Sequence, residues 1–424
     1  MRIYEASILA LKELDKPSTV EEILDTINKN GWYIFNTSNE VAVLKLQIKR
    51  HMKGYTGTHS SKDKYFIKID NKFDLLSNVE KSSPLVLTES EQSNWIKKRE
   101  DYLEEIRDFF RRDQLSLFIG SGVSTSAGFP GWGALLDKLN ASLIRHMCSK
   151  NFGGKLFEKK IDEREKKSLT ELLKHLNDDS PITNAYFLES ALNSPAAFSK
   201  RIREALYGKR QRKYTSETLV WLAKLCNHRG KYRIRSVVTF NFDDLLEQHL
   251  RDIPVDHKPV FRENDEINPN ELPVFHVHGY LPQNDSSYDD LKDNLIVFSE
   301  QAYHTIYTDS YSWSNIIQLY VLKENVCLFI GLSMKDPNMR RILDISARRN
   351  ANNIKHFALM QRIDMDEIEE RDLNKLNLSP GLTECFMEDF HSTREKAFEK
   401  LGIRIVWYED HAEIPGILKK IVTD

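Results

Sequence analysis

The stretch LFIGSGVSTSAGFPGWGALLDKL, which runs from Leu117 to Leu139, decides the fold of the larger part of this 424-residue chain. Its apolar start predicts a buried strand, and its end has the apolar spacing of a helix. Gly120-Ser121-Gly122 stands where the strand must turn into the helix. Glycine there permits a positive φ and lets backbone N–H groups approach a pyrophosphate, although a tight turn alone also explains one Gly-x-Gly.

Short apolar runs of the same kind recur toward the C-terminus, and helical patterns separate most of them. This alternation predicts an α/β fold with a Rossmann-like, doubly wound parallel sheet that binds its ligand at the carboxyl ends of the strands. Residues 134–222 show no strand pattern, so we expect a helical insertion there. The predicted strands are residues 115–120, 236–240, 273–279, 294–298, 325–331, 356–361 and 403–408.

The first 78 residues have a different pattern. Three helical segments precede KYFIKIDNKFDLL (64–76), which alternates apolar and polar residues around a turn and predicts a β-hairpin. Three helices and a hairpin indicate a small winged-helix domain over 1–78, and the segment resembles the HARE-HTH module. Residues 79–98, with a Ser-Ser-Pro sequence, predict a linker before a second domain over 99–424.

The charge of the winged-helix segment bears on nucleic-acid binding. Residues 45–72 contain eight basic and two acidic residues, on the elements that such folds present to a duplex. This predicts DNA contact through 45–72, while a solvated face or a protein-docking face explains the charge equally well. The net charge of the whole chain is only −2, which gives no strong field for nucleic acid.

Composition limits the compartment and the metal content. The chain is 40% hydrophobic, and no apolar run approaches the roughly 18 residues that a membrane span requires. The N-terminus lacks the pattern of a signal peptide, so we expect a cytoplasmic protein with no membrane contact. None of the four cysteines is part of a Cys-x-x-Cys pair, which argues against a zinc module, and we expect no metal.

Polar residues follow three of the predicted strands. Asn241 and Asp243 lie in TFNFDDLLE (239–247), where an Asp also suits a helix N-cap. His278 ends the run FHVHGYL (275–281); its ordinary pKa suits general-base chemistry, whereas a structural role is expected for His276. The segment FIGLSMKDPNMRRIL (329–343) contributes the last group, which is Gly331, Ser333, Asp336 and Asn338.

Together these segments resemble sirtuins. The glycine loop resembles the sirtuin NAD-binding loop, although Gly131-Trp132-Gly133 replaces the Asp-Phe-Arg end. The segment 239–243 resembles the sirtuin motif Thr-Gln-Asn-Ile-Asp. His278 resembles the histidine of the sirtuin His-Gly pair, and residues 331–333 resemble the sirtuin Gly-Thr-Ser segment. The matching positions of the loop are Gly120, Gly122, Ser124, Ala127, Gly128 and Pro130.

Other features depart from the sirtuin deacylases. The sequences Asp336-Pro337-Asn338 and IVFSEQAY (296–303) are typical of a prokaryotic sirtuin-like family, and the cysteine pairs of a zinc module are missing. Residues of about 99–424 therefore resemble the bacterial sirtuin-like NAD hydrolases of anti-phage systems, of the Thoeris, short-Argonaute and HerA-associated types.

The resemblance implies an NAD+ hydrolase that forms nicotinamide and either ADP-ribose or cyclic ADP-ribose, with NAD as substrate. It gives Asn241 the role of positioning water and ribose, and His278 the role of polarising the ribose hydroxyls or activating the water. It implies a homo-oligomer or a HerA-like ATPase partner. The rival hypotheses are a protein deacylase and a non-catalytic NAD or ADP-ribose sensor that binds DNA. The cofactor-binding set is Gly120, Ser121, Gly122, Ser124, Pro130, Asp243, Gly331, Ser333, Asp336 and Asn338.

Overall fold

A computed structural model gives the structure of the protein. Residues 79–88 of the predicted linker, residues 152–163 of the predicted insertion, and Lys62 of the basic segment lie outside the described residues. The residues that the structure describes are 2–35, 39–55, 60–61, 63–69, 71–76, 89–151, 164, 168, 171–172, 181–192, 194–208, 213–227, 234–253, 255–284, 294–348, 355–363 and 380–423.

The chain folds into two compact units. The first consists of Met1–Arg99, Gln361–Lys396 and Trp407–Ile414, and the second of Glu100–Met360, Ala397–Val406 and Pro415–Asp424. The predicted division into a domain over 1–78, a linker over 79–98 and a second domain over 99–424 stays a prediction.

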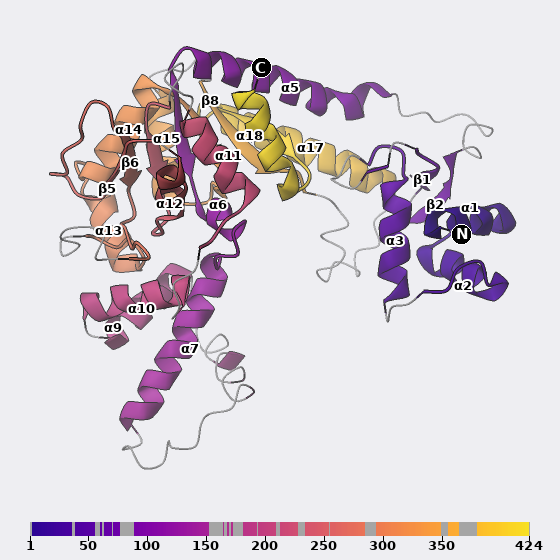
Figure 1. Cartoon of the computed structure of the whole chain (residues 1–424), viewed down its shortest axis with the longest axis horizontal. Coiled ribbons are helices and arrows are strands. Elements are labelled where there is room, and N and C mark those ends of the chain that lie inside the picture. Colours follow the sequence, from indigo (N-terminus) through magenta and orange to yellow (C-terminus); the bar gives the residue numbers. More distant parts are fainter. Residues whose placement is uncertain are drawn as a thin grey trace. The chain divides into compact units, whose positions relative to one another are not determined.

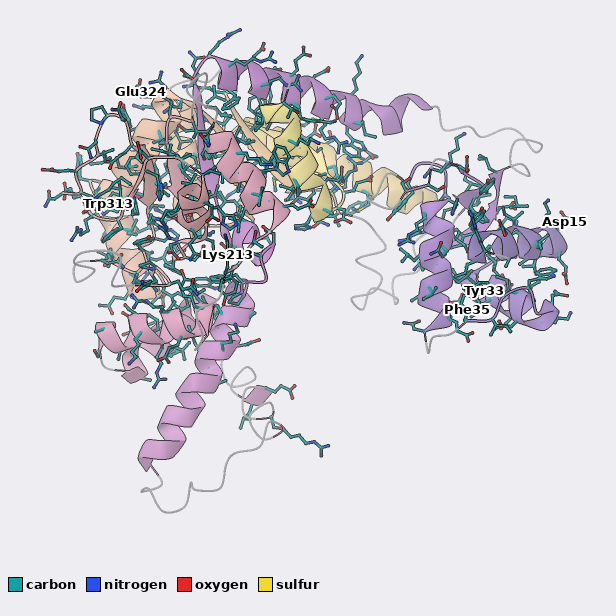
Figure 2. All side chains as sticks on the ribbon, viewed as in Figure 1. Asp15, Tyr33, Phe35, Lys213, Trp313 and Glu324 are labelled. Atoms are coloured by element: carbon teal, nitrogen blue, oxygen red, sulfur yellow. The ribbon has the colours of Figure 1, made fainter. Side chains whose placement is uncertain are left out.

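The N-terminal residues form three helices and an antiparallel hairpin, and the core side chains come from the apolar spacing of the helices. Thr19 begins the second helix with a capping box, because its hydroxyl accepts from the Glu22 N–H and its own N–H donates to the Glu22 carboxylate. Tyr33 and Phe35 pack edge to face, with centroids 4.9 Å apart (Figure 2). The winged-helix assignment stays a prediction. The elements are α1 (Ile3–Leu14), α2 (Val20–Asn30), α3 (Glu40–Arg50), β1 (Phe66–Ile69) and β2 (Lys72–Leu75).

A seven-stranded sheet forms the centre of the α/β fold, with the strand order β5-β6-β4-β3-β7-β8-β9. The pairs β5–β6, β6–β4, β4–β3, β3–β7 and β7–β8 are parallel. Without β5, the order along the sheet is the 3-2-1-4-5-6 order of a Rossmann fold, so the predicted fold class is confirmed. The strands are β3 (Leu115–Ile119), β4 (Val237–Thr239), β5 (His257–Val260), β6 (Leu272–His276), β7 (Val326–Ile330), β8 (His356–Gln361) and β9 (Ile403–Tyr408).

Helices connect the strands and form the described part of the predicted insertion. In that part α7, α9 and α10 pack against one another, as Figure 1 shows. The helix α5 begins at Glu89, so the last ten residues of the predicted linker are helical, and no glycine or proline interrupts them. The helices are α5 (Glu89–Arg111), α6 (Ser121–Thr125), α7 (Trp132–Asn151), α9 (Pro181–Leu192), α10 (Pro195–Tyr207), α11 (Glu217–Cys226), α12 (Leu245–Asp252), α13 (Glu300–Thr308), α14 (Trp313–Glu324), α15 (Pro337–Arg348), α17 (Pro380–Glu399), η3 (His411–Glu413) and α18 (Ile414–Val422).

One predicted strand is wrong. Residues 294–298 form an extended loop that packs on the turn after β6, where the Val297 N–H donates to the His278 oxygen at 2.8 Å. Asn294 also bonds to both main-chain groups of Tyr280. Val297 and Phe298 are therefore buried outside the sheet, whereas Leu295 is exposed. The strand β5, with the sequence His-Lys-Pro-Val, has no apolar run and was not predicted.

Candidate functional site

The carboxyl ends of the four central strands lie level with one another. Ile119, the last residue of β3, pairs with Thr239 at the end of β4 and with Ile330 at the end of β7. Thr239 pairs in turn with His276, the last residue of β6. The loops after these strands therefore leave one edge of the sheet, where doubly wound folds bind ligands. The predicted site residues lie on these loops and in the turns and helices that follow them.

The glycine loop after β3 runs backbone against backbone along the loop after β7. The Gly122 N–H donates to the Gly331 oxygen at 2.9 Å, and the Gly120 N–H donates to the Ile330 oxygen at 3.0 Å. A Cβ on Gly122 would lie 2.7 Å from the Gly331 Cα, and Gly331 itself has a φ of +66°. These glycines are needed for the contact between the loops, since no side chain fits there.

The side-chain amide of Asn241 joins the loop after β4 to the glycine loop. Its Nδ2 donates to the Gly120 oxygen at 3.1 Å and to Ser124 Oγ at 2.9 Å. The Gly120 oxygen only accepts, so the NH2 end of the amide must face it. Both amide hydrogens are then used, and Oδ1 of the buried Asn241 receives no hydrogen bond from the described residues.

Ser124 links the side chain of Asn241 to that of Asp243. The Ser124 hydroxyl donates to Asp243 Oδ2 at 2.8 Å, and Asp243 Oδ1 accepts from the Leu245 N–H at 3.2 Å. Burial raises the pKa of Asp243 to about 6, while the two hydrogen bonds oppose that shift. The chain Asn241–Ser124–Asp243 thus ends on a carboxylate that titrates close to neutral pH.

The predicted strand over 273–279 included His278. In the structure β6 ends at His276, and His278 lies in the turn that follows. Gly279 follows with a φ of +103°, and a Cβ there would meet the Leu295 oxygen at 2.4 Å. The imidazole contacts the rings of Phe240 and Tyr303 edge to face, with centroids 4.9 and 5.6 Å away. Burial lowers the pKa of His278, against the opposing charge of Asp336, which favours the neutral ring that a base requires.

Two residues predicted to bind the cofactor also have hydrogen-bond partners within the protein. Asp336 accepts from the Tyr303 hydroxyl at 2.8 Å and from the Met339 N–H at 2.7 Å, at the start of α15. Asn338 is buried, donates to Asn315 Oδ1 at 3.1 Å and accepts from Arg341. Both carboxylate oxygens of Asp336 and both ends of the Asn338 amide are therefore engaged within the protein.

The remaining predicted residues lie closer to solvent. Ser121 and Ser333 are exposed and Pro130 is half-buried. Ser121 is the first residue of α6, two positions after the end of β3, and Ser333 lies in the loop after β7.

Two features of the site were missed in the sequence. His276, expected to be structural, bonds to the main-chain oxygen of Asn241 and to Glu247, which was not singled out at all. The Tyr207 hydroxyl accepts from the Asp244 N–H, and its single hydrogen is shared between Asp244 Oδ1 and the Leu281 oxygen, at 3.0 and 2.9 Å. Local sequence patterns could not reveal these contacts, since each joins residues at least 29 positions apart.

The basic segment 45–72 is partly used inside the N-terminal fold. Lys64 Nζ donates to the main-chain oxygens of Arg50 and Tyr55 and to Ser60 Oγ, at 3.3, 2.9 and 2.5 Å. Burial lowers the pKa of Lys64. Lys64 therefore holds a loop together, and any DNA contact must use the other basic residues.

In the part of the chain that the structure describes, no cluster of three or more His, Cys, Asp or Glu side chains is arranged to hold a metal ion. Cys226 and Cys327 are buried, and burial raises the pKa of the Cys226 thiol to about 12. None of the described helices has the length and the apolar character needed to cross a membrane.

Comparison with known proteins agrees with this geometry. Residues 235–380 match the family model of the SIR2-like domain, which covers the loops with Asn241, His278 and Gly331 but not the glycine loop. The chain is also 26% identical over 205 residues to the NAD(+) hydrolase ThsA of Enterococcus faecium. That alignment spans 46% of this chain and 39% of the enterococcal protein. The chain thus combines a Rossmann-like sheet with a segment that is similar to the SIR2-like domain.

Proposed function

We propose that the protein is an NAD+ glycohydrolase that cleaves the bond between nicotinamide and ribose. The observation that supports this best is the fixed orientation of Asn241, whose two amide hydrogens are held by Gly120 and Ser124. Its Oδ1 is left as an acceptor at the carboxyl edge of the sheet. An oriented acceptor of this kind suits a water molecule or a ribose hydroxyl, both of which donate.

The chemistry demands little acid catalysis. Nicotinamide leaves as a neutral molecule, and the transition state resembles the oxocarbenium ion of glycoside cleavage. Asn241 positions the water, and neutral His278 accepts a proton from a ribose hydroxyl or from that water, which contributes roughly 10²–10⁴ in rate. Asp243 keeps Asn241 in place through Ser124.

The loops after β3 and β7 form the other half of the proposed site. Their glycines bring two backbones together at the switch point of the sheet, between β3 and β7. We assign the phosphates and the adenosine half of NAD to Gly120, Ser121, Gly122, Ser124, Pro130, Gly331 and Ser333. Asp336 and Asn338 support this region through α13, α14 and α15 and are not assigned a contact with NAD.

The biological role follows from the activity and from the resemblance in sequence. An enzyme that destroys NAD is toxic to its own cell, so we propose an effector of anti-phage defence that acts by NAD depletion once it is switched on. Assembly into a homo-oligomer or with a HerA-like ATPase would supply the control, and the N-terminal domain would bind DNA or protein. The name of the enterococcal relative supports the hydrolase and says nothing of these partners.

The test is nicotinamide release from NAD by the purified chain at several protein concentrations. Asn241→Ala and His278→Ala should each lower turnover by roughly 10²-fold or more. Asn268→Ala and His304→Ala replace exposed residues of the same types and should leave turnover unchanged. Undiminished turnover in both site variants would refute the assignment.

Two further arms separate the rival functions. An acetyl-lysine peptide is added to the reaction, and release of nicotinamide only in its presence would indicate a deacylase. Calorimetric binding of NAD without any nicotinamide release would indicate a sensor. Free ADP-ribose and cyclic ADP-ribose are resolved by chromatography of the product.

A further inference from the structure

We propose that Glu247 and His276 form a buried ion pair whose role is to fix the main chain of Asn241, which makes both of them positioning residues for the hydrolysis. The role in hydrolysis rests on the proposed NAD+ hydrolase function, whereas the ion pair and its hold on Asn241 are open to a separate test.

Three elements meet at this pair. His276 is the last residue of β6, Glu247 lies in the first turn of α12, and Asn241 lies in the loop between β4 and that helix. The side chains of His276 and Glu247 are each only 1% exposed. His276 Nε2 lies 2.6 Å from Glu247 Oε1, and its Nδ1 lies 3.1 Å from the main-chain oxygen of Asn241.

The acceptors decide where the protons are. The Asn241 oxygen is a carbonyl and cannot donate, so His276 Nδ1 must carry a hydrogen. A short contact of 2.6 Å is typical of a charge-assisted hydrogen bond, in which Nε2–H donates to an ionised carboxylate. The charge of His276 lowers the pKa of Glu247 against its burial, in agreement with an ionised Glu247. His276 is then an imidazolium with both hydrogens donated.

The contact completes the fixation of Asn241. Its N–H donates to Thr239 Oγ1 at 3.1 Å, and its side-chain hydrogens go to Gly120 and Ser124. With His276 on the carbonyl oxygen, every polar group of Asn241 except Oδ1 has a partner among the described residues. A rotation of the 241 peptide would carry Oδ1 away from its place, so the pair controls the position of the reacting acceptor.

The surroundings separate the pair from bulk solvent. The Tyr280 ring lies against His276 with centroids 4.3 Å apart, and the Phe261 ring stacks on Tyr280 at 5.3 Å. The other charged groups that face Glu247 are His257 and Asp243. Replacing one member alone leaves a buried charge without its partner and threatens the fold. The decisive variants therefore replace both members together.

Two double variants have nearly the same shape and differ in whether position 276 carries an amide group. Glu247→Leu with His276→Asn keeps an N–H group near the position of Nδ1, since the Asn amide branches where the imidazole does. Glu247→Leu with His276→Leu has nearly the same shape and no donor. Both lack the ion pair, so a difference between them reports the contact with Asn241 alone.

The measurements are kcat and KM for nicotinamide release, with thermal unfolding as a check on the fold. We expect kcat of the Leu/Leu variant to fall by about 100-fold, the effect of a displaced catalytic group, with KM and the unfolding transition close to those of the Leu/Asn variant. The Leu/Asn variant should recover at least tenfold of that loss. Equal kcat in the two variants would overturn the positioning role.

A readout without turnover separates this inference from the proposed function. Imidazole ¹⁵N resonances of histidine-labelled protein, assigned by comparison with the Leu/Asn variant, should show His276 protonated on both nitrogens. The Asn241 side-chain amide, assigned with Asn241→Ala, should exchange with solvent faster in the Leu/Leu variant than in the Leu/Asn variant. An unprotonated ring nitrogen on His276 would refute the ion pair, and equal exchange rates would refute its hold on Asn241, whether or not the unmodified protein hydrolyses NAD.

Discussion

The side chain of Asn241 donates a hydrogen to the main-chain oxygen of Gly120 at 3.1 Å, across 121 positions of sequence. This contact fixes which end of the amide faces the protein, because a carbonyl oxygen only accepts. It also makes the glycine loop a partner of the proposed catalytic residue, beside its role against Gly331. A substitution that disturbs the loop after β3 or the loop after β4 should therefore lower the rate of hydrolysis by displacing Asn241.

Replacing Ser124 with alanine should test this dependence directly. The variant removes the acceptor of one Asn241 hydrogen and the donor to Asp243, so the amide is free to turn. We expect kcat for nicotinamide release to fall by roughly 10- to 100-fold with a small change in KM. Ser126→Ala is the control, since Ser126 bonds to Ser216 and to the Val123 oxygen instead. Equal activity of the two variants would disprove the relay.

Activity should decrease as the pH falls through about 6, because Asp243 then takes up a proton. The protonated carboxyl no longer needs the Ser124 hydroxyl as a donor, and the orientation of the chain to Asn241 is lost. A pH profile of kcat measures this. Asp243→Asn should have low kcat throughout and no transition near pH 6. A transition that persists in that variant would assign it to another group.

Stability should change in the opposite direction. The pKa of Asp243 is raised from 3.8 to about 6 in the folded protein, so the folded state holds the proton more tightly than the unfolded state. The contribution is full below the unfolded pKa and is lost as the pH rises through about 6, a loss of about 3 kcal/mol. Chemical unfolding at pH 4 and pH 8 should show Asp243→Asn gaining stability relative to the unmodified protein as pH rises. A constant difference would refute the raised pKa.

The glycine contact predicts unequal effects of two alanine substitutions. Gly331 and Gly128 both have a left-handed φ, +66° and +83°, so alanine costs about 1–2 kcal/mol at either position. At Gly331 the new Cβ would also meet the Val123 nitrogen at 2.6 Å, whereas at Gly128 it has no neighbour within 4 Å. Gly331→Ala should lose roughly 1–3 kcal/mol more in urea unfolding, with weaker NAD binding by calorimetry. Equal losses would contradict the close approach of the loops.

The sequence predicted the parts of this site that depend on topology. Buried parallel strands are recognisable as apolar runs, and polar residues just after them must gather at one edge, which brings Asn241, His278 and the glycine loop together. The failures have physical causes as well. The strand β5 is short and polar, and the run 294–298 is apolar because it covers the turn at Gly279.

The sequence did not predict which side chains hydrogen-bond to one another. Asn338 looked like a ligand residue, yet its amide is used by Asn315 and Arg341. His276 looked like a core histidine, yet it holds the Asn241 peptide. In both cases a residue type fits two roles, and only the partner, supplied from a distant segment, decides between them.

The protein should lose stability in acid through His356. Burial lowers the pKa of this histidine to about 3, so the unfolded chain takes up the proton first, and stability is lost as the pH falls from about 6.5 toward 3. His356 Nδ1 accepts the Cys327 N–H at 3.2 Å. In His356→Asn the amide oxygen can accept that N–H and cannot protonate, so unfolding should depend less on pH. His304→Asn, at an exposed position, should leave the acid transition unchanged, and an unchanged transition in His356→Asn would refute this assignment.

The hydroxyl of Tyr207, at the end of α10, should matter for catalysis as well as for stability. It bonds to Asp244, three residues after Asn241, and to the Leu281 oxygen, three residues after His278. Tyr207→Phe leaves buried groups without a partner, at a cost of about 1–3 kcal/mol, and frees both loops. We expect kcat for nicotinamide release to fall about tenfold, equivalent to about 1.4 kcal/mol of transition-state stabilisation. Tyr214→Phe is the matched control, because the buried Tyr214 hydroxyl donates to the main-chain oxygen of Tyr207. It should destabilise the fold by a similar amount and leave kcat unchanged; a fall in kcat for both variants would show that loss of stability alone accounts for the effect.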